Sequence, residues 1–156
     1  MTVAIGIVGC AGRMGRTVVQ EVLAKDGCRL AGGTELSGGP IGTDLGALVG
    51  AEPAGVSITN NTEALFEASD VVIDFTIPAA TRLHAEAAAA SGTAYVVGTT
   101  GLGKEEQATV DAAAETAAVV QAPNFSEGVN VLFAVTQKIA ATLGADYDIE
   151  ILEKLF

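Results

Sequence analysis

Three glycines near the start of the chain have the spacing of a phosphate-binding turn. Gly9, Gly12 and Gly15 follow the apolar segment 3–8 in the run Gly9-Cys10-Ala11-Gly12-Arg13-Met14-Gly15. Glycine permits a sharp turn after a strand, leaves room for a pyrophosphate, and lets the next helix pack closely. A helix that begins here offers N–H groups and a partial positive charge to phosphates. The pattern therefore indicates a dinucleotide site.

A carboxylate stands where the same site requires one. Glu35 ends a second apolar segment, 28–34, and follows the turn by about 20 residues, a spacing that suits hydrogen bonds to the adenosine ribose. The glycine spacing is G-x-x-G-x-x-G instead of the commoner G-x-G-x-x-G, and the chain has 19 glycines. The turn alone therefore also fits a tight strand–helix turn of another α/β domain. The order strand, glycines, helix, strand, acid favours the dinucleotide site.

Apolar and amphipathic segments alternate along the chain, which predicts an α/β fold with a doubly wound, mainly parallel sheet, a Rossmann-like dinucleotide-binding domain. We expect this domain to span residues 1–125, and residues 126–156 to form a connecting helix and the first strand of a truncated substrate domain. The alternation is interrupted at 36–55, which predicts a loop with one short helical turn. Strands are expected at 3–8, 28–34, 56–59, 71–76, 94–98, 117–121 and 147–153, and helices at 13–25, 62–68, 79–91, 104–116 and 126–143.

Polar turns follow several of the expected strands. They begin at Asp74, Gly98 and Pro123, and in an open α/β sheet this edge is where ligands bind. Asp74 is interpreted as a structural acid that accepts hydrogen bonds from neighbouring backbone N–H groups. His84, the only histidine, is interpreted as a surface or interface residue, because no acid–base partner lies at a suitable spacing.

Composition limits which binding partners and which cellular location are expected for this chain. The 156 residues suffice for about one domain, and 49% are apolar. A net charge of −11 disfavours nucleic acid and anionic membranes as partners. Cys10 and Cys28 form no C-x-x-C pair and no metal-ligand cluster, so we expect small, buried, reduced residues. No targeting or transmembrane segment is apparent, so a cytoplasmic location is expected.

Four motifs together resemble dihydrodipicolinate reductase (4-hydroxy-tetrahydrodipicolinate reductase). They are Gly9 to Arg16, Asp74-Phe75-Thr76, Gly98-Thr99-Thr100-Gly101 and Asn124-Phe125-Ser126-Glu127-Gly128-Val129-Asn130, and the likeness extends over 3–153. The resemblance implies an oxidoreductase of the diaminopimelate and lysine pathway. Such an enzyme transfers a hydride from NADH or NADPH to a cyclic imine dicarboxylate.

The resemblance also implies which residues bind the cofactor. The glycine turn would hold the pyrophosphate and Glu35 the adenosine ribose, and the turns after 94–98 and 117–121 would surround the nicotinamide. No catalytic residue and no metal ligand is carried over to this chain. The implied cofactor-binding residues are Gly9, Cys10, Ala11, Gly12, Arg13, Met14, Glu35, Phe75, Thr76, Gly98, Thr99, Thr100, Ala122, Pro123, Asn124 and Phe125.

One departure from the family concerns the choice of cofactor. Many members place an arginine after the acid, where it holds the 2′-phosphate of NADPH, whereas this chain has Leu36. We therefore expect NADH to be preferred over NADPH. Arg13 and Arg16 remain alternative partners for a 2′-phosphate.

A second departure concerns catalysis. In the family a His-His-x-x-x-Lys segment follows the strand that matches 148–153, and here Leu155 and Phe156 stand in place of the histidines. We expect a cofactor-binding half that is inactive alone and meets its substrate only if the missing domain is supplied. Two other interpretations stay open, a non-catalytic NAD(H)-binding module and a different two-domain dehydrogenase. Residues 147–156 are expected to be disordered or to pair between chains in self-association.

Overall fold

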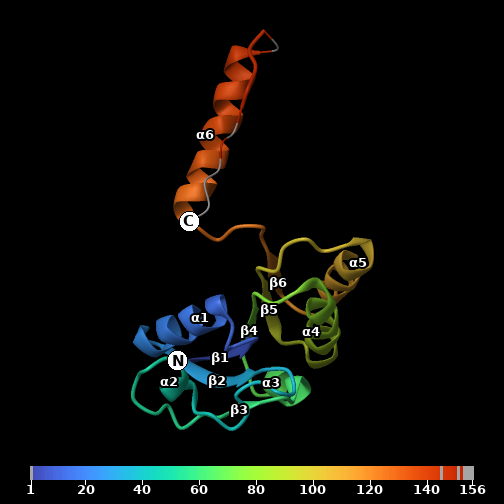
Figure 1. The fold of residues 1–156 in the computed structure, drawn as a ribbon. Helices are drawn as coiled ribbons and strands as arrows, with labels where there is room; N and C mark the ends of the chain where they lie inside the picture. The colour runs from blue at the N-terminus through green and yellow to red at the C-terminus, as the bar shows by residue number, and fades with distance from the viewer. Residues whose placement is uncertain (1, 145, 151, 153–156) are drawn as a thin grey trace. The chain divides into compact units, whose positions relative to one another are not determined.

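The structure is a computed structural model that describes residues 2–144, 146–150 and 152. Six strands alternate with six helices along the chain (Figure 1). In order they are β1 (Val3–Val8), α1 (Arg13–Ala24), β2 (Cys28–Thr34), α2 (Leu45–Leu48), β3 (Ile58–Thr59), α3 (Thr62–Glu67), β4 (Val71–Asp74), α4 (Pro78–Ser91), β5 (Ala94–Val97), α5 (Lys104–Ala113), β6 (Val119–Gln121) and α6 (Glu127–Leu143).

The strands form one parallel sheet in the order β3-β2-β1-β4-β5-β6. The chain reverses its direction of winding between β1 and β4, which places the crevice of a doubly wound fold at the carboxyl ends of these two strands. The register aligns those ends, because Val8 pairs with Thr34 on one side and with Asp74 on the other. The predicted fold class, a Rossmann-like sheet, is confirmed.

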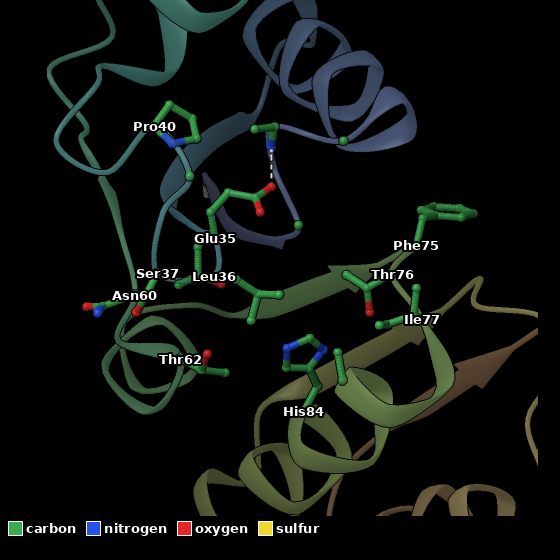
Figure 2. Close-up of a pocket in the computed structure, with 16 residues that line it drawn as sticks. Glu35, Leu36, Ser37, Pro40, Asn60, Thr62, Phe75, Thr76, Ile77 and His84 are labelled. Carbon is green, nitrogen blue, oxygen red and sulfur yellow. Dashed lines mark hydrogen bonds between the residues drawn. The ribbon is translucent and has the colours of Figure 1, made fainter.

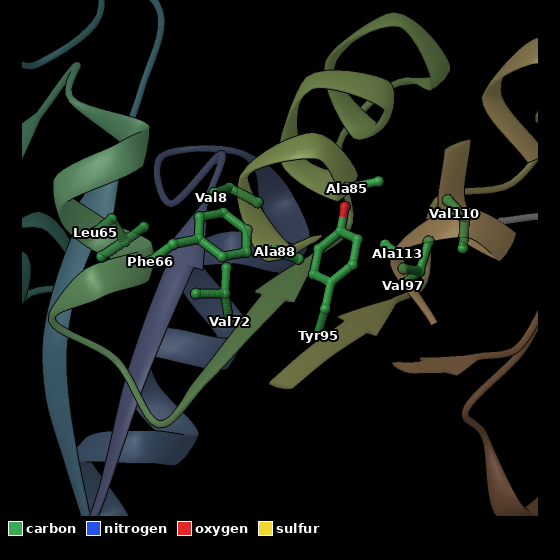
Figure 3. Close-up of a cluster of buried hydrophobic side chains, with 10 residues drawn as sticks. All are labelled: Val8, Leu65, Phe66, Val72, Ala85, Ala88, Tyr95, Val97, Val110 and Ala113. Carbon is green, nitrogen blue, oxygen red and sulfur yellow. The ribbon is translucent and has the colours of Figure 1, made fainter. Parts of the chain in front are cut away.

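Helices cover both faces of the sheet, and the apolar side chains of the strands alternate between them. In one cluster Val72 lies beside Phe66 of α3, and Val97 lies beside Val110 and Ala113 of α5 (Figure 3). The rings of Phe66 and Tyr95 meet edge to face, with centroids 5.7 Å apart. Ile5 and Ile7 join the opposite cluster, built with α1 and α2. Because both faces are buried, the strands are nearly continuous apolar runs.

Two strands, β4 and β5, end earlier than the sequence predicts, while β3 and β6 begin two residues later, and β4 shows why a strand stops short. Its last residue is Asp74, whose carboxylate Oδ1 accepts a hydrogen bond from the N–H of Thr76 at 2.8 Å. That bond turns the chain out of the ladder, so that Phe75 and Thr76 lie beyond the edge of the sheet. The shortened strand thus delivers two predicted site residues to the carboxyl edge.

Residues 124–156 form a compact unit separate from residues 1–123. Its helix α6 starts after Ser126, whose hydroxyl caps the N–H of Val129, and has no buried residue. The strand expected at 147–153 is wrong for positions 147–150 and 152, which are irregular, while 151 and 153 lie outside the described residues. A strand needs a neighbour to satisfy its backbone, and the described residues offer these positions none. Self-association through 147–156 stays a prediction.

Within the described ranges, no helix is both long and apolar enough to cross a membrane.

Candidate functional site

The glycine turn has the geometry that its sequence predicts. Gly9 has φ +66°, a conformation that favours glycine, and its N–H is bonded to the carbonyl of Thr34 at 2.9 Å. A Cβ on Gly15 would overlap the carbonyl of Gly9 and the backbone of Cys10. Gly15 therefore permits the close helix packing that the sequence predicts, and the backbone it lies against is that of the turn.

The first turn of α1 is open to an anion. Its N-cap is Gly12, and no side chain caps the helix. The first N–H groups of a helix have no partners within it, and together with the helix dipole they attract negative charge. Gly12 is exposed and adds no side chain above them. These features fit a phosphate group.

Glu35 lies directly beside the turn. Its carboxylate Oε1 accepts a hydrogen bond from the N–H of Ala11 at 2.7 Å. The guanidinium of Arg16 donates to the carbonyl of Ala11 at 2.9 Å and also to the carbonyl of Leu48. The peptide groups on either side of Ala11 are thus held in place, and Arg16 is committed to backbone oxygens.

A cleft of about 640 Å³ opens above the ends of β1, β2 and β4 (Figure 2). Part of its lining is apolar: Leu36 and Ile77 expose 75% and 59% of their surface, and Pro40 and Ala80 also line the cleft. The cleft contains six of the predicted site residues, Gly9, Ala11, Gly12, Glu35, Phe75 and Thr76, and also Leu36, which the sequence linked to the choice of cofactor. The other residues that line it were not selected from the sequence as site residues, namely Thr34, Ser37, Gly39, Pro40, Asn60, Thr62, Ile77, Ala80 and His84.

A second depression, of about 360 Å³, lies at the ends of β5 and β6. It brings together four further predicted residues, Thr99, Thr100, Ala122 and Pro123. Gly98, also predicted, lies against the ring of Phe75, and a Cβ at Gly98 would overlap that ring. The loops after β4 and β5 therefore touch, which links the two depressions.

The remaining predicted site residues lie elsewhere. The side chain of Cys10 is fully buried beside Gly33 and Leu45, so only its backbone borders the turn. Arg13 and Met14 are exposed on the first turn of α1. Asn124 and Phe125 belong to the other unit, so their part in the site stays a prediction.

Both cysteines are free thiols, Cys10 buried and Cys28 half-buried. Burial, reinforced by the negative charge of Glu35, raises the pKa of Cys10 to about 12. Cys10 is therefore a neutral packing residue, in agreement with the small, buried, reduced cysteine that the sequence predicts. Among the described residues no group of three or more His, Cys, Asp or Glu is placed to hold a metal ion.

Asp74 is a fully buried carboxylate at the end of the central strand β4. Its Oδ1 accepts from the N–H and hydroxyl of Thr76, at 2.8 and 2.6 Å, and from the hydroxyl of Thr99 at 3.0 Å. Its Oδ2 accepts from Thr81 at 3.1 Å, from the phenol of Tyr95, and meets His84 Nδ1 at 2.8 Å. One donor is a backbone N–H, as predicted. The others are side chains, which the sequence did not reveal.

These donors keep the carboxylate ionised. Burial alone would raise the pKa of Asp74, but the hydrogen bonds and the charge of His84, with Thr76 and Tyr95, outweigh it and lower the pKa to about 2. Burial and the charge of Asp74 raise the pKa of Tyr95, so the phenol remains a donor.

The surface role expected for His84 is wrong. The residue is only 8% exposed, its Nδ1 contacts Asp74, and its ring rises from α4 at the floor of the cleft (Figure 2). Its acid partner was missed because it lies ten residues earlier on a strand, beyond any helical spacing. The one pattern in the sequence that could have indicated the contact is the spacing of Thr81 and His84. They lie three residues apart, on one face of α4, and both contact the carboxylate of Asp74.

Comparison with known proteins decides the family. The model for "Dihydrodipicolinate reductase, N-terminus" matches residues 3–125. The chain belongs to the dihydrodipicolinate reductase family. The resemblance drawn from the four motifs is thereby confirmed.

Curated dihydrodipicolinate reductase relatives match nearly the whole chain but only part of their own length. The 4-hydroxy-tetrahydrodipicolinate reductase of Magnetococcus marinus is 44% identical over 154 residues, covering 98% of this chain and 58% of that protein. That of Dinoroseobacter shibae is 45% identical over 150 residues, covering 96% and 56%. The chain therefore spans little more than half the length of these relatives.

Solved structures agree on the fold. The dipicolinate-bound dihydrodipicolinate reductase from Paenisporosarcina sp. TG-14 superposes with a TM-score of 0.72 at 26% identity, over 90% of this chain and 54% of that one. An oxidoreductase from Agrobacterium radiobacter in complex with NAD+ gives 0.66 at 18% identity, over 88% of this chain and 41% of that one. The second likeness shows the shared fold alone. The chain is thus an N-terminal, NAD(P)-binding domain of the dihydrodipicolinate reductase family.

Proposed function

We propose that this chain binds a nicotinamide dinucleotide as the cofactor-binding half of a 4-hydroxy-tetrahydrodipicolinate reductase. The observation that carries the proposal is the uncapped first turn of α1 beside a cleft that also contains Glu35, at the switch point between β1 and β4. A dinucleotide needs an anion site, a ribose acceptor and an apolar surface for its base, and the cleft offers each of them.

Each group of the cofactor has a matching surface. The first turn of α1, where Gly12 leaves room, would hold the pyrophosphate. Glu35 Oε1 accepts the N–H of Ala11, and Oε2 would accept a ribose hydroxyl. Leu36 and Ile77, which line the same cleft as His84, would contact the adenine. Thr99 and Thr100, in the loop after β5, would border the nicotinamide.

The bound cofactor would supply the hydride, and the protein's contribution is placement. We propose that residues 1–156 alone bind the dinucleotide without turnover, and that the substrate engages only when the part of the relatives not covered here is supplied. The second candidate, a non-catalytic NAD(H)-binding module, rests on the same cleft. Adding that missing part separates the two, because only the reductase half gains turnover.

We further propose that NADH is preferred over NADPH. A 2′-phosphate would lie beside the carboxylate of Glu35, and the adjacent Leu36 supplies no positive charge. Arg16, one of the alternative partners, already donates to two backbone carbonyls. Repulsion between like charges in a partly buried cleft costs on the order of 1–4 kcal/mol, so the affinities should differ about tenfold or more.

The experiment is a titration of the purified chain with NADH and NADPH, followed by cofactor fluorescence. Gly12→Val adds a branched side chain at the N-cap of α1, with its Cβ 3.2 Å from the carbonyl oxygen of Gly9, and should abolish saturable binding. Gly103→Val is the matched control, because Gly103 is also an extended N-cap glycine, on α5, outside the cleft. Circular dichroism verifies that both variants fold. Equal NADH affinity of the Gly12→Val variant and the wild type would contradict the proposal.

A further inference from the structure

Asp74 stands at a junction between the two depressions of the site. Its Oδ1 holds the loop after β4 through Thr76 and the loop after β5 through Thr99. Thr76 lines the larger cleft, and Thr99 lines the smaller depression. One buried oxygen atom, Asp74 Oδ1, is therefore hydrogen-bonded to a residue of each depression.

The hydrogen bonds around that oxygen form a closed triangle. The hydroxyl of Thr99 donates to Asp74 Oδ1 at 3.0 Å and accepts from the N–H of Thr76 at 3.0 Å, while the same N–H also reaches Oδ1 at 2.8 Å. The N–H of Gly98 is bonded to the main-chain carbonyl of Asp74 at 2.8 Å. Gly98 also lies against the ring of Phe75. A shift of either loop must break or stretch this triangle.

Thr99 is placed to act through its neighbours. It is 5% exposed, and its hydroxyl is engaged by both Asp74 and Thr76. A buried hydroxyl with both a donor and an acceptor partner has little capacity left for a ligand.

We propose that Asp74 and Thr99 are positioning residues that couple the two ends of the dinucleotide site, so that the loop after β5 sets the shape of the adenosine end. The inference rests on the proposed function, since it takes the two depressions as the two ends of one cofactor site. If the two ends are coupled, a substitution at Thr99 changes the affinity for a ligand that binds the adenosine end and does not reach the loop after β5.

Two valine variants separate this coupling from a general loss of stability. Thr99→Val and Thr81→Val each replace a buried threonine that donates one hydrogen bond of about 3 Å to Asp74. Asp74 keeps donors on both oxygens in either variant, and the N–H of Thr76 keeps Oδ1 as its acceptor. Both variants should therefore fold. They differ in what the lost hydroxyl holds. The Thr99 hydroxyl also accepts from the N–H of Thr76 in the loop after β4, whereas among the described residues the Thr81 hydroxyl bonds Asp74 alone.

The ligand to use is ADP, which carries the adenosine and diphosphate but no nicotinamide. Calorimetric titration should give the Thr99→Val variant an ADP affinity about fivefold or more below wild type, which is part of the free energy of the charge-assisted hydrogen bond lost between Thr99 and Asp74. The Thr81→Val variant should remain within about twofold of wild type. Hydrogen exchange of the Thr76 amide should accelerate in the Thr99→Val variant only, and Thr99→Ser should restore both properties.

The outcomes are distinguishable. If Thr99→Val lowers NADH affinity and leaves ADP affinity unchanged, Thr99 acts by local contact and the coupling is refuted. Equal effects of the two valine variants on ADP affinity would mean that the hydrogen bonds around Asp74 only stabilise the fold, and would also refute the coupling. If the wild-type chain binds neither ADP nor NADH, the proposed function itself fails.

Discussion

Replacing the buried carboxylate of Asp74 by an amide should remove most of the pH dependence that this residue gives to folding. Asn at position 74 keeps the shape but not the charge, and its NH2 group would face donors that now bond Oδ1 or Oδ2. Such a mismatch in a buried site costs about 3–5 kcal/mol at neutral pH.

The pH dependence follows from the folded pKa of Asp74. That pKa is lowered from 3.8 to about 2, so the unfolded chain takes up the proton first as pH falls. The associated stability is fully present above pH 4 and is lost as pH falls toward 2. One pKa unit corresponds to about 1.4 kcal/mol, which makes this contribution about 2 kcal/mol.

The assay is urea unfolding of wild type and the Asp74→Asn variant, monitored by far-ultraviolet circular dichroism at pH 7, 5, 4, 3 and 2. Other carboxylates titrate in both proteins, so the difference in unfolding free energy isolates Asp74. That difference should shrink by about 2 kcal/mol between pH 5 and pH 2. A difference that stays constant over this range would refute the ionised, donor-bound state of Asp74.

Other substitutions test other parts of the structure. Leu36→Arg places a cation beside the expected 2′-phosphate and should raise NADPH affinity about tenfold relative to NADH in fluorescence titrations, and an unchanged ratio would contradict the cofactor assignment. Gly15→Ala should sharply lower the melting temperature, because its Cβ overlaps the backbone of the turn, while Gly103→Ala should not, because its Cβ meets only the flexible end of the Glu106 side chain. Phe66→Ala, at a fully buried ring, should cost about 3–5 kcal/mol in urea unfolding, and a loss below about 1 kcal/mol would contradict its place in the core. Asp44→Ala should speed hydrogen exchange at Gly46, Ala47, Ala54 and Val56, whose N–H groups bond its carboxylate, and unchanged exchange would refute that role.

The sequence predicted the features that depend on local order. The glycine turn and Glu35 could be identified because both follow apolar strand runs at a spacing that the fold imposes. The order of strands and helices followed from hydrophobic periodicity. The helices expected at 62–68 and 126–143 begin beside Asn61 and Ser126, whose side chains cap their own helices, so the signal for these starts is local.

What the sequence did not predict depends on distant partners. The contact between His84 and Asp74 requires α4 to cross over β4 and β5, and no local pattern encodes this. The bond from Arg16 to Leu48 closes a loop between segments far apart along the chain. The expected strand at 147–153 was inferred from alternation alone, which cannot supply the neighbouring strand that a ladder needs.

The burial of Cys10 makes its thiol an intrinsic chemical reporter of the glycine turn. Its thiol sits in the core beneath the turn, with a pKa of about 12, so in the folded protein the reactive thiolate is almost absent. Alkylation at this position therefore requires the turn to open. The rate at which iodoacetamide labels Cys10, compared with the half-buried Cys28, measures how often the turn unfolds, and any ligand that closes over it will slow that labelling.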